Sequence, residues 1–245
     1  MSHPQQRRFL ERVAALHPAR GPLLEIGSLD VNGTVRDLFP DADPYVGLDL
    51  APGAAVDVVA SGHDFGPSEG FDTVVTTECL EHDPGWHLTL RNVVRVLRPG
   101  GTLLLTCATT GRHEHGTART SPAMSPSTND HYRNLTARDV LAHLEPALRV
   151  DLVATDWSAF DLYVVARKPP APPPHPALAL LARRYRRDGW RPSRAADRAV
   201  LRAFRTHEMG DVPLWAGLAV HPVRALRLGV ALVREADPPG RRARP

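Results

Sequence analysis

A glycine and an acidic residue, each at the end of a short apolar segment, form the first pair that could do chemistry. Residues 23–26 are apolar and lead into Gly27, and residues 45–49 form the next such run and end at Asp49. A glycine at the end of a strand lets the backbone turn tightly and approach a ligand. A carboxylate about 20 residues further on is placed to accept both hydrogens of a ribose diol. The pair predicts a ligand with a nucleoside, without distinguishing a dinucleotide from another nucleoside cofactor.

Two histidines are candidates for a general base, a side chain that takes a proton from a nucleophile. His82 follows the apolar segment 71–76, and His131 follows a long polar segment. Histidine titrates close to pH 7, so it can take a proton from an attacking oxygen or nitrogen. The alternative for His82 is structural, with the ring tying down a neighbouring helix through a hydrogen bond.

The polar segment also contains residue types that bind metals. His113 and His115 flank Glu114, and His131 lies downstream. No cysteine and no firm ligand spacing accompanies them. We therefore expect a solvated loop here and no metal.

Short apolar runs alternate with segments of helical periodicity. Strands are predicted at 23–26, 45–49, 56–59, 71–76 and 102–106, and helices at 4–17, 35–39, 86–97 and 136–148, the last with Thr136 as N-cap. A turn is predicted at 98–101. This alternation favours a mainly parallel sheet covered on both faces. Strands at 149–155 and 162–167 are joined too tightly for a crossover helix, so they predict an antiparallel hairpin at the sheet edge.

Two segments break this pattern. Residues 108–130 are rich in Thr, Ser, Pro and His, and long loops of this kind are usually functional lids or disordered segments. Residues 168–176 contain six prolines and predict a stiff linker. The linker divides the chain into a domain at 1–167 and an arginine-rich helical extension at 177–245.

Charge is unevenly distributed along the chain. Residues 177–245 carry 15 arginines and 6 acidic residues, a net charge of +9, which leaves −6 for residues 1–176. We interpret the extension as a helical appendage that packs on the preceding domain or on a second subunit, which would make an oligomer. Peripheral contact with an anionic membrane is an alternative. Nucleic-acid binding is not expected, because the arginines are not interleaved with stacking aromatics.

The cytoplasm is the predicted location. The two cysteines, Cys79 and Cys107, show no pairing pattern, as expected in a reducing compartment. The N-terminus lacks the apolar run of a signal peptide, and no run approaches the roughly 18 apolar residues that span a bilayer.

Several segments, in order, resemble the motifs of class I S-adenosylmethionine-dependent methyltransferases. Glu25-Ile26-Gly27 resembles their first motif, FDTVVTTECLEH at 71–82 their fourth-strand motif, and VLRPGGTL at 96–103 the turn before their fifth strand. The closing hairpin is similar to their antiparallel last strands, and the resemblance covers about residues 20–167. It implies a Rossmann-like, seven-stranded, mostly parallel α/β sheet with an antiparallel last strand, and S-adenosylmethionine as cofactor.

The resemblance also implies which residues hold the cofactor. Residues after the first strand would contact its methionine and ribose, and those after the second its ribose hydroxyls and adenine. The loop after the third strand would read the adenine edge, and the end of the fourth would face the methionine. The residues so assigned are Glu25, Gly27, Ser28, Asp49, Leu50, Gly62, His63, Asp64, Thr77 and Glu78.

The chain departs from the family pattern in two places. Family members commonly have G-x-G-x-G, where this chain has Gly27 and then Asn32-Gly33. Ser61 stands where the family often has an aspartate, which shifts the expected adenine contact to the backbone or to His63-Asp64. In the family, the stretch that corresponds to His131-Tyr132-Arg133 helps to close the pocket.

The function expected on this basis is methyl transfer to an oxygen or nitrogen of a small molecule, in secondary metabolism for example. A small acceptor is favoured because residues 1–176 are acidic and the lid is a short local insertion. One alternative is a non-catalytic interaction module that keeps the fold. The other is an NAD(P)-dependent oxidoreductase, which is disfavoured because the chain lacks G-x-G-x-x-G.

Overall fold

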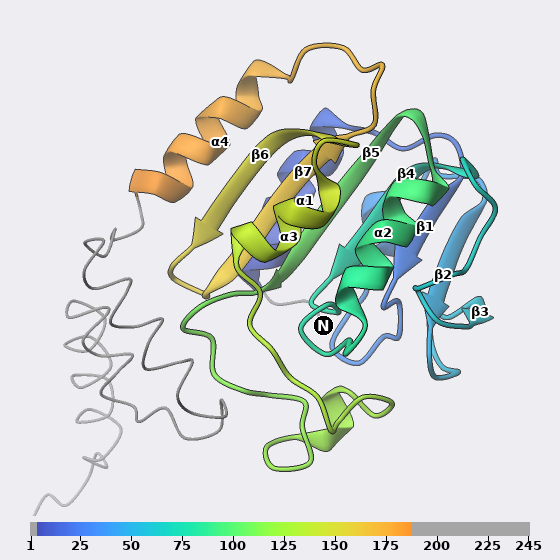
Figure 1. The fold of residues 1–245 in the computed structure, drawn as a ribbon, viewed down its shortest axis with the longest axis vertical. Coiled ribbons are helices and arrows are strands. Elements are labelled where there is room, and N and C mark those ends of the chain that lie inside the picture. Colours follow the sequence, from blue (N-terminus) through green and yellow to red (C-terminus); the bar gives the residue numbers. More distant parts are fainter. Residues whose placement is uncertain (1–3, 188–245) are drawn as a thin grey trace, which may run out of the picture. The chain divides into compact units, whose positions relative to one another are not determined.

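A seven-stranded sheet organises residues 4–187, which are the residues that the computed structural model describes (Figure 1). The strand order is β3-β2-β1-β4-β5-β7-β6. Neighbouring strands from β3 to β5 run parallel, and β7 runs antiparallel to both β5 and β6. The strands are β1 (Leu23–Ile26), β2 (Tyr45–Asp49), β3 (Val58–Val59), β4 (Phe71–Thr77), β5 (Leu97–Ala108), β6 (Arg149–Asp156) and β7 (Asp161–Arg167). The predicted fold class and the edge hairpin are confirmed.

Helices cover both faces of this sheet. The α-helices are α1 (Pro4–Leu16), α2 (Trp86–Val96), α3 (Ala137–Leu144) and α4 (Pro176–Arg187), and short 3-10 helices occur at η1 (Arg36–Leu38) and η2 (Pro122–Met124). Figure 1 shows α2 and α3 in front of the sheet. Within the described residues, no helix is both long enough and apolar enough to cross a membrane.

Alternation along the central strands builds a separate core on each face. Leu103 and Leu105 of β5 pack into the core beneath α2 and α3, whereas Leu104 packs into the core beneath α1 and α4. Successive side chains of a strand point to opposite faces, so a strand buried on both sides reads as a continuous apolar run. Phe9 of α1 stacks on Tyr163 of β7 with ring centroids 4.3 Å apart, which fixes α1 on the second face.

The beginning of β5 differs from the prediction. The predicted turn at 98–101 lies inside the strand, because Leu97 already pairs with Phe71 of β4. The ladder is irregular after this pair, and Gly100 has a φ of +83°. Lys168 holds the segment from the other side, accepting a hydrogen bond from the Gly100 amide at 2.8 Å.

Prolines shorten two of the predicted helices. The helix predicted at 136–148 ends at Leu144, because Pro146 disfavours helical backbone at Glu145, whose ψ is 146°. Its predicted N-cap is confirmed: Thr136 and Asp139 form a reciprocal capping box. The helix predicted at 35–39 is reduced to the 3-10 helix η1, because Pro40 disfavours helical backbone at the residue before it.

The proline-rich segment does not separate α4 from the sheet. Arg149 and Arg167 donate hydrogen bonds to the carbonyls of Ala171 and Pro173, both at 3.0 Å. Three residues on one face of α4, Leu178, Ala182 and Tyr185, join the second core. The domain boundary expected at the linker 168–176 stays a prediction. Most of the predicted extension at 177–245 lies outside the described residues.

Candidate functional site

A pocket opens at the carboxyl ends of β1, β2 and β4, where parallel α/β sheets commonly bind ligands. Six of the predicted cofactor residues line it: Gly27, Asp49, Leu50, Gly62, His63 and Glu78. His82, one of the two predicted catalytic residues, also lines it. The predicted cofactor residues that do not line it are Glu25, Ser28, Asp64 and Thr77.

Gly27 forms the tight turn that the sequence predicts, with a φ of +82°. A Cβ built on it would lie 2.6 Å from the Cβ of Cys79. The loop after β1 therefore touches the loop after β4, and this contact demands a glycine even before any ligand is considered.

The Asp49 carboxylate is held in position by the backbone around it. Its two oxygens accept hydrogen bonds from the amides of Leu29 at 3.2 Å and Ala51 at 3.1 Å. A carboxylate has about four acceptor positions, so it keeps the capacity to bind a diol. Beside it, the Leu50 side chain is 49% exposed and offers an apolar surface at the pocket wall.

Glu25 lies on the other face of β1. Its carboxylate accepts a hydrogen bond from the hydroxyl of Tyr45 at 2.7 Å. Burial raises the pKa of Glu25 to about 7, although the hydrogen bond from Tyr45 opposes the rise. The side chain is 2% exposed and does not reach the pocket.

Asp83 is a pocket residue that the sequence analysis did not identify. It accepts hydrogen bonds from the Gly85 amide at 2.7 Å and the Thr89 hydroxyl at 2.6 Å. Its Oδ1 also lies 3.0 Å from Nε2 of His63, so the start of α2 is tied to the loop after β3. The signal in the sequence was its position directly after the E-x-L-E-H motif.

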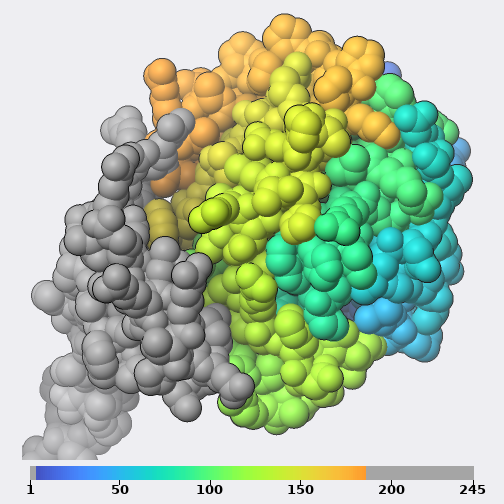
Figure 2. All heavy atoms as spheres, viewed as in Figure 1, coloured from blue at the N-terminus to red at the C-terminus, as the bar shows by residue number. Residues whose placement is uncertain are grey.

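The predicted lid segment contributes one wall of the pocket. Met124, at the end of η2, and residues 125–128 line it opposite the strand ends. The hydroxyls of Ser125 and Thr128 lie 2.8 Å apart and bond across this short stretch. In Figure 2, the lime-green spheres of this part of the chain cover the surface below the sea-green spheres of α2.

Glu78 directly follows β4 and has a strained backbone, with a φ of +49°. Non-glycine residues rarely adopt such angles, and they do so more often at functional sites. Its Oε1 accepts a hydrogen bond from the Thr106 hydroxyl at 3.1 Å, and that hydroxyl accepts one from Gln6 of α1 at 3.0 Å. Glu78 is thus anchored to the sheet beside the pocket.

His82 lies between the pocket and a cluster of aromatic rings. Its ring centroid is 5.0 Å from that of His115 and 5.4 Å from that of Tyr132. Neither ring nitrogen has a hydrogen-bond partner among the described residues, so a structural hydrogen bond through the ring is not its role. Burial and the neighbouring His115 lower the pKa of His82 to about 3.

His131, the second predicted catalytic residue, lies near His82 but does not line the pocket. Its amide donates a hydrogen bond to the Thr128 carbonyl at 3.0 Å, so it directly follows the lid wall. The structure therefore brings both predicted histidines to one region, with His82 buried at the pocket and His131 half-buried beside it.

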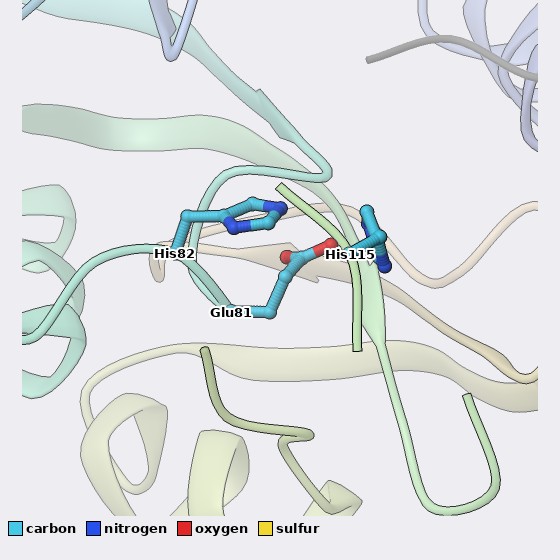
Figure 3. A group of neighbouring side chains, drawn as sticks. All are labelled: Glu81, His82 and His115. Carbon is cyan, nitrogen blue, oxygen red and sulfur yellow. The ribbon is translucent and has the colours of Figure 1, made fainter. Parts of the chain in front are cut away.

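Glu81 completes the region below His82. Its side chain is 0% exposed, and its Oε1 accepts a hydrogen bond from the Ala108 amide at 3.2 Å. Burial, with the charge of Glu78 as the next cause, raises the pKa of Glu81 to about 8. Ligand-type atoms of Glu81, His82 and His115 all lie within 4.8 Å of one another (Figure 3).

The four residues considered as metal ligands from the sequence do not assemble with one another. His113 is exposed, and Glu114 pairs with Arg119 at 2.8 Å and with the Thr117 hydroxyl. Of these four, His115 is the one that joins a group of potential ligands within residues 4–187, with Glu81 and His82 from the segment after β4. Sequence spacing could not reveal this contact, because it depends on the path of the long loop.

Comparison with solved structures shows a shared fold. The cyclase SpnF is similar at 16% identity, over 67% of this chain and 82% of its own, with a TM-score of 0.51. A candidate methyltransferase from Bacillus halodurans is similar at 15% identity, over 67% of this chain and 99% of its own, with a TM-score of 0.50. The N-methyltransferase NodS from Bradyrhizobium japonicum, in complex with S-adenosyl-l-homocysteine, has 20% identity over 67% and 86% of the two chains and a TM-score of 0.49.

Comparison with curated proteins gives no match. The sequence profile of a methyltransferase domain, however, matches residues 3–147, more than half of the chain. The match includes every strand that forms the pocket, and it decides against a nicotinamide-dependent oxidoreductase. The chain therefore belongs to the methyltransferase-domain family, as a class I S-adenosylmethionine-dependent methyltransferase.

Proposed function

We propose that this pocket holds S-adenosylmethionine and that the enzyme methylates a small molecule. The observation that carries the proposal is the pairing, in one pocket, of the Asp49 carboxylate with the Gly27 turn and Glu78. Asp49 would hold the ribose hydroxyls, and Gly27 and Glu78 would face the methionine part. The sulfonium of the cofactor supplies an activated methyl group, so positioning of the acceptor provides most of the catalysis.

The pocket fits the cofactor in polarity as well as in position. Apolar side chains of Ile26, Leu29 and Leu50 line the part around Asp49, which suits an adenosine. Ser61 and His63 add polar groups there. Glu78 and His82 make the other part more polar, which suits an amino-acid end and an acceptor.

His82 is a poor candidate for a general base, which leaves His131 of the two predicted histidines. A base is most effective when its pKa lies near the working pH, and that of His82 is about 3. A general base is also commonly oriented by a hydrogen bond to its second nitrogen. Neither ring nitrogen of His82 has such a partner among the described residues, and Nε2 of His131 lacks one as well, so it is the low pKa that disfavours His82.

A small acceptor agrees with the charge and the enclosure of the site. Residues 1–176 carry a net charge of −6, which disfavours a polyanion such as nucleic acid. Residues 124–128 form a wall opposite the strand ends and narrow the access to the pocket. Both oxygen and nitrogen acceptors remain compatible with these features.

Calorimetric titration with S-adenosylhomocysteine tests the cofactor site. The full chain should bind it with a Kd near 1 μM, which corresponds to about −8 kcal/mol. Asp49→Ala removes hydrogen bonds to a charged group, worth about 1.5–3 kcal/mol, and should weaken binding roughly 10–150-fold. Asp41→Ala is the matched control, because Asp41 is exposed and lies outside the pocket. Equal affinity in the Asp49 and Asp41 variants, or binding of NADH instead, would overturn the proposal.

A further inference from the structure

We propose that Glu81, His82 and His115 bind a divalent transition-metal ion at the inner side of the pocket. Their ligand-type atoms lie within 4.8 Å of one another, although they come from two distant segments of the chain. Figure 3 shows the carboxylate of Glu81 and the rings of the two histidines converging on a common region.

Two members of this cluster, Glu81 and His82, have buried polar atoms without a hydrogen-bond partner among the described residues. Oε2 of Glu81 and both ring nitrogens of His82 are buried without a hydrogen bond within the described residues. Glu81 is 0% exposed and His82 is 6% exposed, so bulk water does not compensate them. Buried polar atoms are nearly always satisfied, and unsatisfied ones often mark an unseen ion or water. A cation would satisfy the carboxylate and one imidazole at the same time.

Neighbouring hydrogen bonds prepare two of the ligands. Nδ1 of His115 lies 3.0 Å from the carbonyl oxygen of His113. A carbonyl only accepts, so Nδ1 carries the proton and Nε2 presents its lone pair. The Glu81 carboxylate is held through Oε1 by the amide of Ala108, at 3.2 Å. Supporting contacts of this kind orient the ligands in known metal sites.

The loop backbone reaches His82 closely enough to support such a site. Gly116 has a φ of +71°, and a Cβ built on it would lie 2.6 Å from Cε1 of His82. The residue next to it, His115, is therefore fixed against the His82 ring. Two ligands bound to zinc at about 2.1 Å in a tetrahedron lie roughly 3.4 Å apart, so ion binding would contract the cluster.

The donor set indicates the class of metal. Two imidazoles and one carboxylate are typical of zinc and of other first-row divalent ions such as iron or manganese. Three protein ligands leave at least one coordination position open, as in catalytic rather than structural sites. His82 also lines the pocket, so the open position is expected to face the acceptor.

The consequence for the acceptor rests on the proposed function. A hydroxyl bound to the metal becomes more acidic, because the ion stabilises the oxygen anion. It would release its proton to His131 or to water, and the oxygen would be held as an anion beside the pocket. The site thus favours a hydroxylated small molecule as the acceptor, and O-methylation over N-methylation.

Metal binding can be measured without the methyl donor. The full chain, with any affinity tag removed, is stripped with a chelator and titrated with Zn²⁺ against a chromogenic competitor. We expect one zinc ion per chain, with binding weakened at least tenfold by His82→Ala, Glu81→Gln and His115→Ala. His87→Ala is the matched control, because His87 lies on α2 outside the cluster, and it should bind zinc as the wild type does. Substitution with Co²⁺ should give the visible absorption of a site with nitrogen ligands, and this should be lost in His115→Ala.

The outcomes separate this proposal from that for the cofactor site. Failure to bind zinc, or equal weakening by His87→Ala and His115→Ala, would overturn the metal site even if S-adenosylhomocysteine still binds. Zinc binding without S-adenosylhomocysteine binding would support the metal site and remove the proposed function. His115 lies on a loop outside the cores, so its variant keeps the test decisive if a variant of buried Glu81 does not fold.

Discussion

Replacement of Gly27 by alanine should destabilise the protein because of one specific contact. The new Cβ would lie 2.6 Å from Cβ and 2.7 Å from Sγ of Cys79. Relief of such overpacking typically costs about 1–3 kcal/mol. The φ of +82° adds roughly 1–2 kcal/mol for a residue with a side chain. The free energy of unfolding should therefore fall by about 2–5 kcal/mol.

A second substitution separates the two contributions. Cys79→Gly removes both clashing atoms, and the nearest remaining atom of residue 79, Cα, is 3.8 Å away, an ordinary contact. In the double variant, the clash is absent and only the backbone strain remains. Cys79→Ala is the matched control, because it removes Sγ but keeps the Cβ that is in the way.

Urea unfolding followed by circular dichroism gives the four free energies of this cycle. We expect a coupling of about 1–3 kcal/mol between Gly27→Ala and Cys79→Gly, and much less between Gly27→Ala and Cys79→Ala. Coupling below about 0.5 kcal/mol in the first cycle would be within ordinary additivity. That result would refute the view that Cys79 is the reason for a glycine at this position.

Two further substitutions test local energetics. Folding raises the pKa of Glu25 from 4.5 to about 7, so the folded state favours the protonated carboxyl. The contribution of this group to the free energy of unfolding is therefore full below pH 4.5, and it is lost as the pH rises through 7. Between pH 4.5 and 7, the free energy of unfolding of the wild type should fall by up to about 3 kcal/mol more than that of Glu25→Gln, at about 1.36 kcal/mol per pH unit. Parallel pH profiles of stability in the wild type and the variant would disprove the shift. Thr136→Ala should lower the free energy of unfolding by about 1 kcal/mol through loss of the capping box. Thr110→Ala, at a loop position outside the helices and strands, should change it less, and equal effects of the two substitutions would contradict the cap.

Much of the fold could be predicted because local and global signals agree. The strands β1, β2, β4 and β7 could be predicted from the length of their apolar runs and from the turns on either side. The position of α4 could not be predicted, because the proline content of residues 168–176 predicts stiffness and says nothing about what the following helix packs on. Leu178, Ala182 and Tyr185 lie on one helical face, but their partner, Tyr163 of β7, is a tertiary contact.

The site was less predictable, since it depends on which way each side chain points. Ile26 lies on the pocket side of β1 and Glu25, one residue earlier, on the opposite face with Leu23. A motif match cannot tell these two faces apart, whereas strand alternation can. Neither a motif match nor strand alternation could predict that His115 approaches Glu81, because the sequence of a loop without periodicity does not indicate where its side chains point.

His82 is the residue on which the chemical alternatives differ most. A general base must exchange a proton with the acceptor and recover it from solvent, so it benefits from partial exposure and an orienting partner. A metal ligand needs the opposite: a neutral, buried ring with an available lone pair. His82 is 6% exposed, has no hydrogen-bond partner within residues 4–187, and lies within reach of a buried carboxylate and a second histidine. These three properties together favour a ligand, and the movement of protons is then left to His131 or to water.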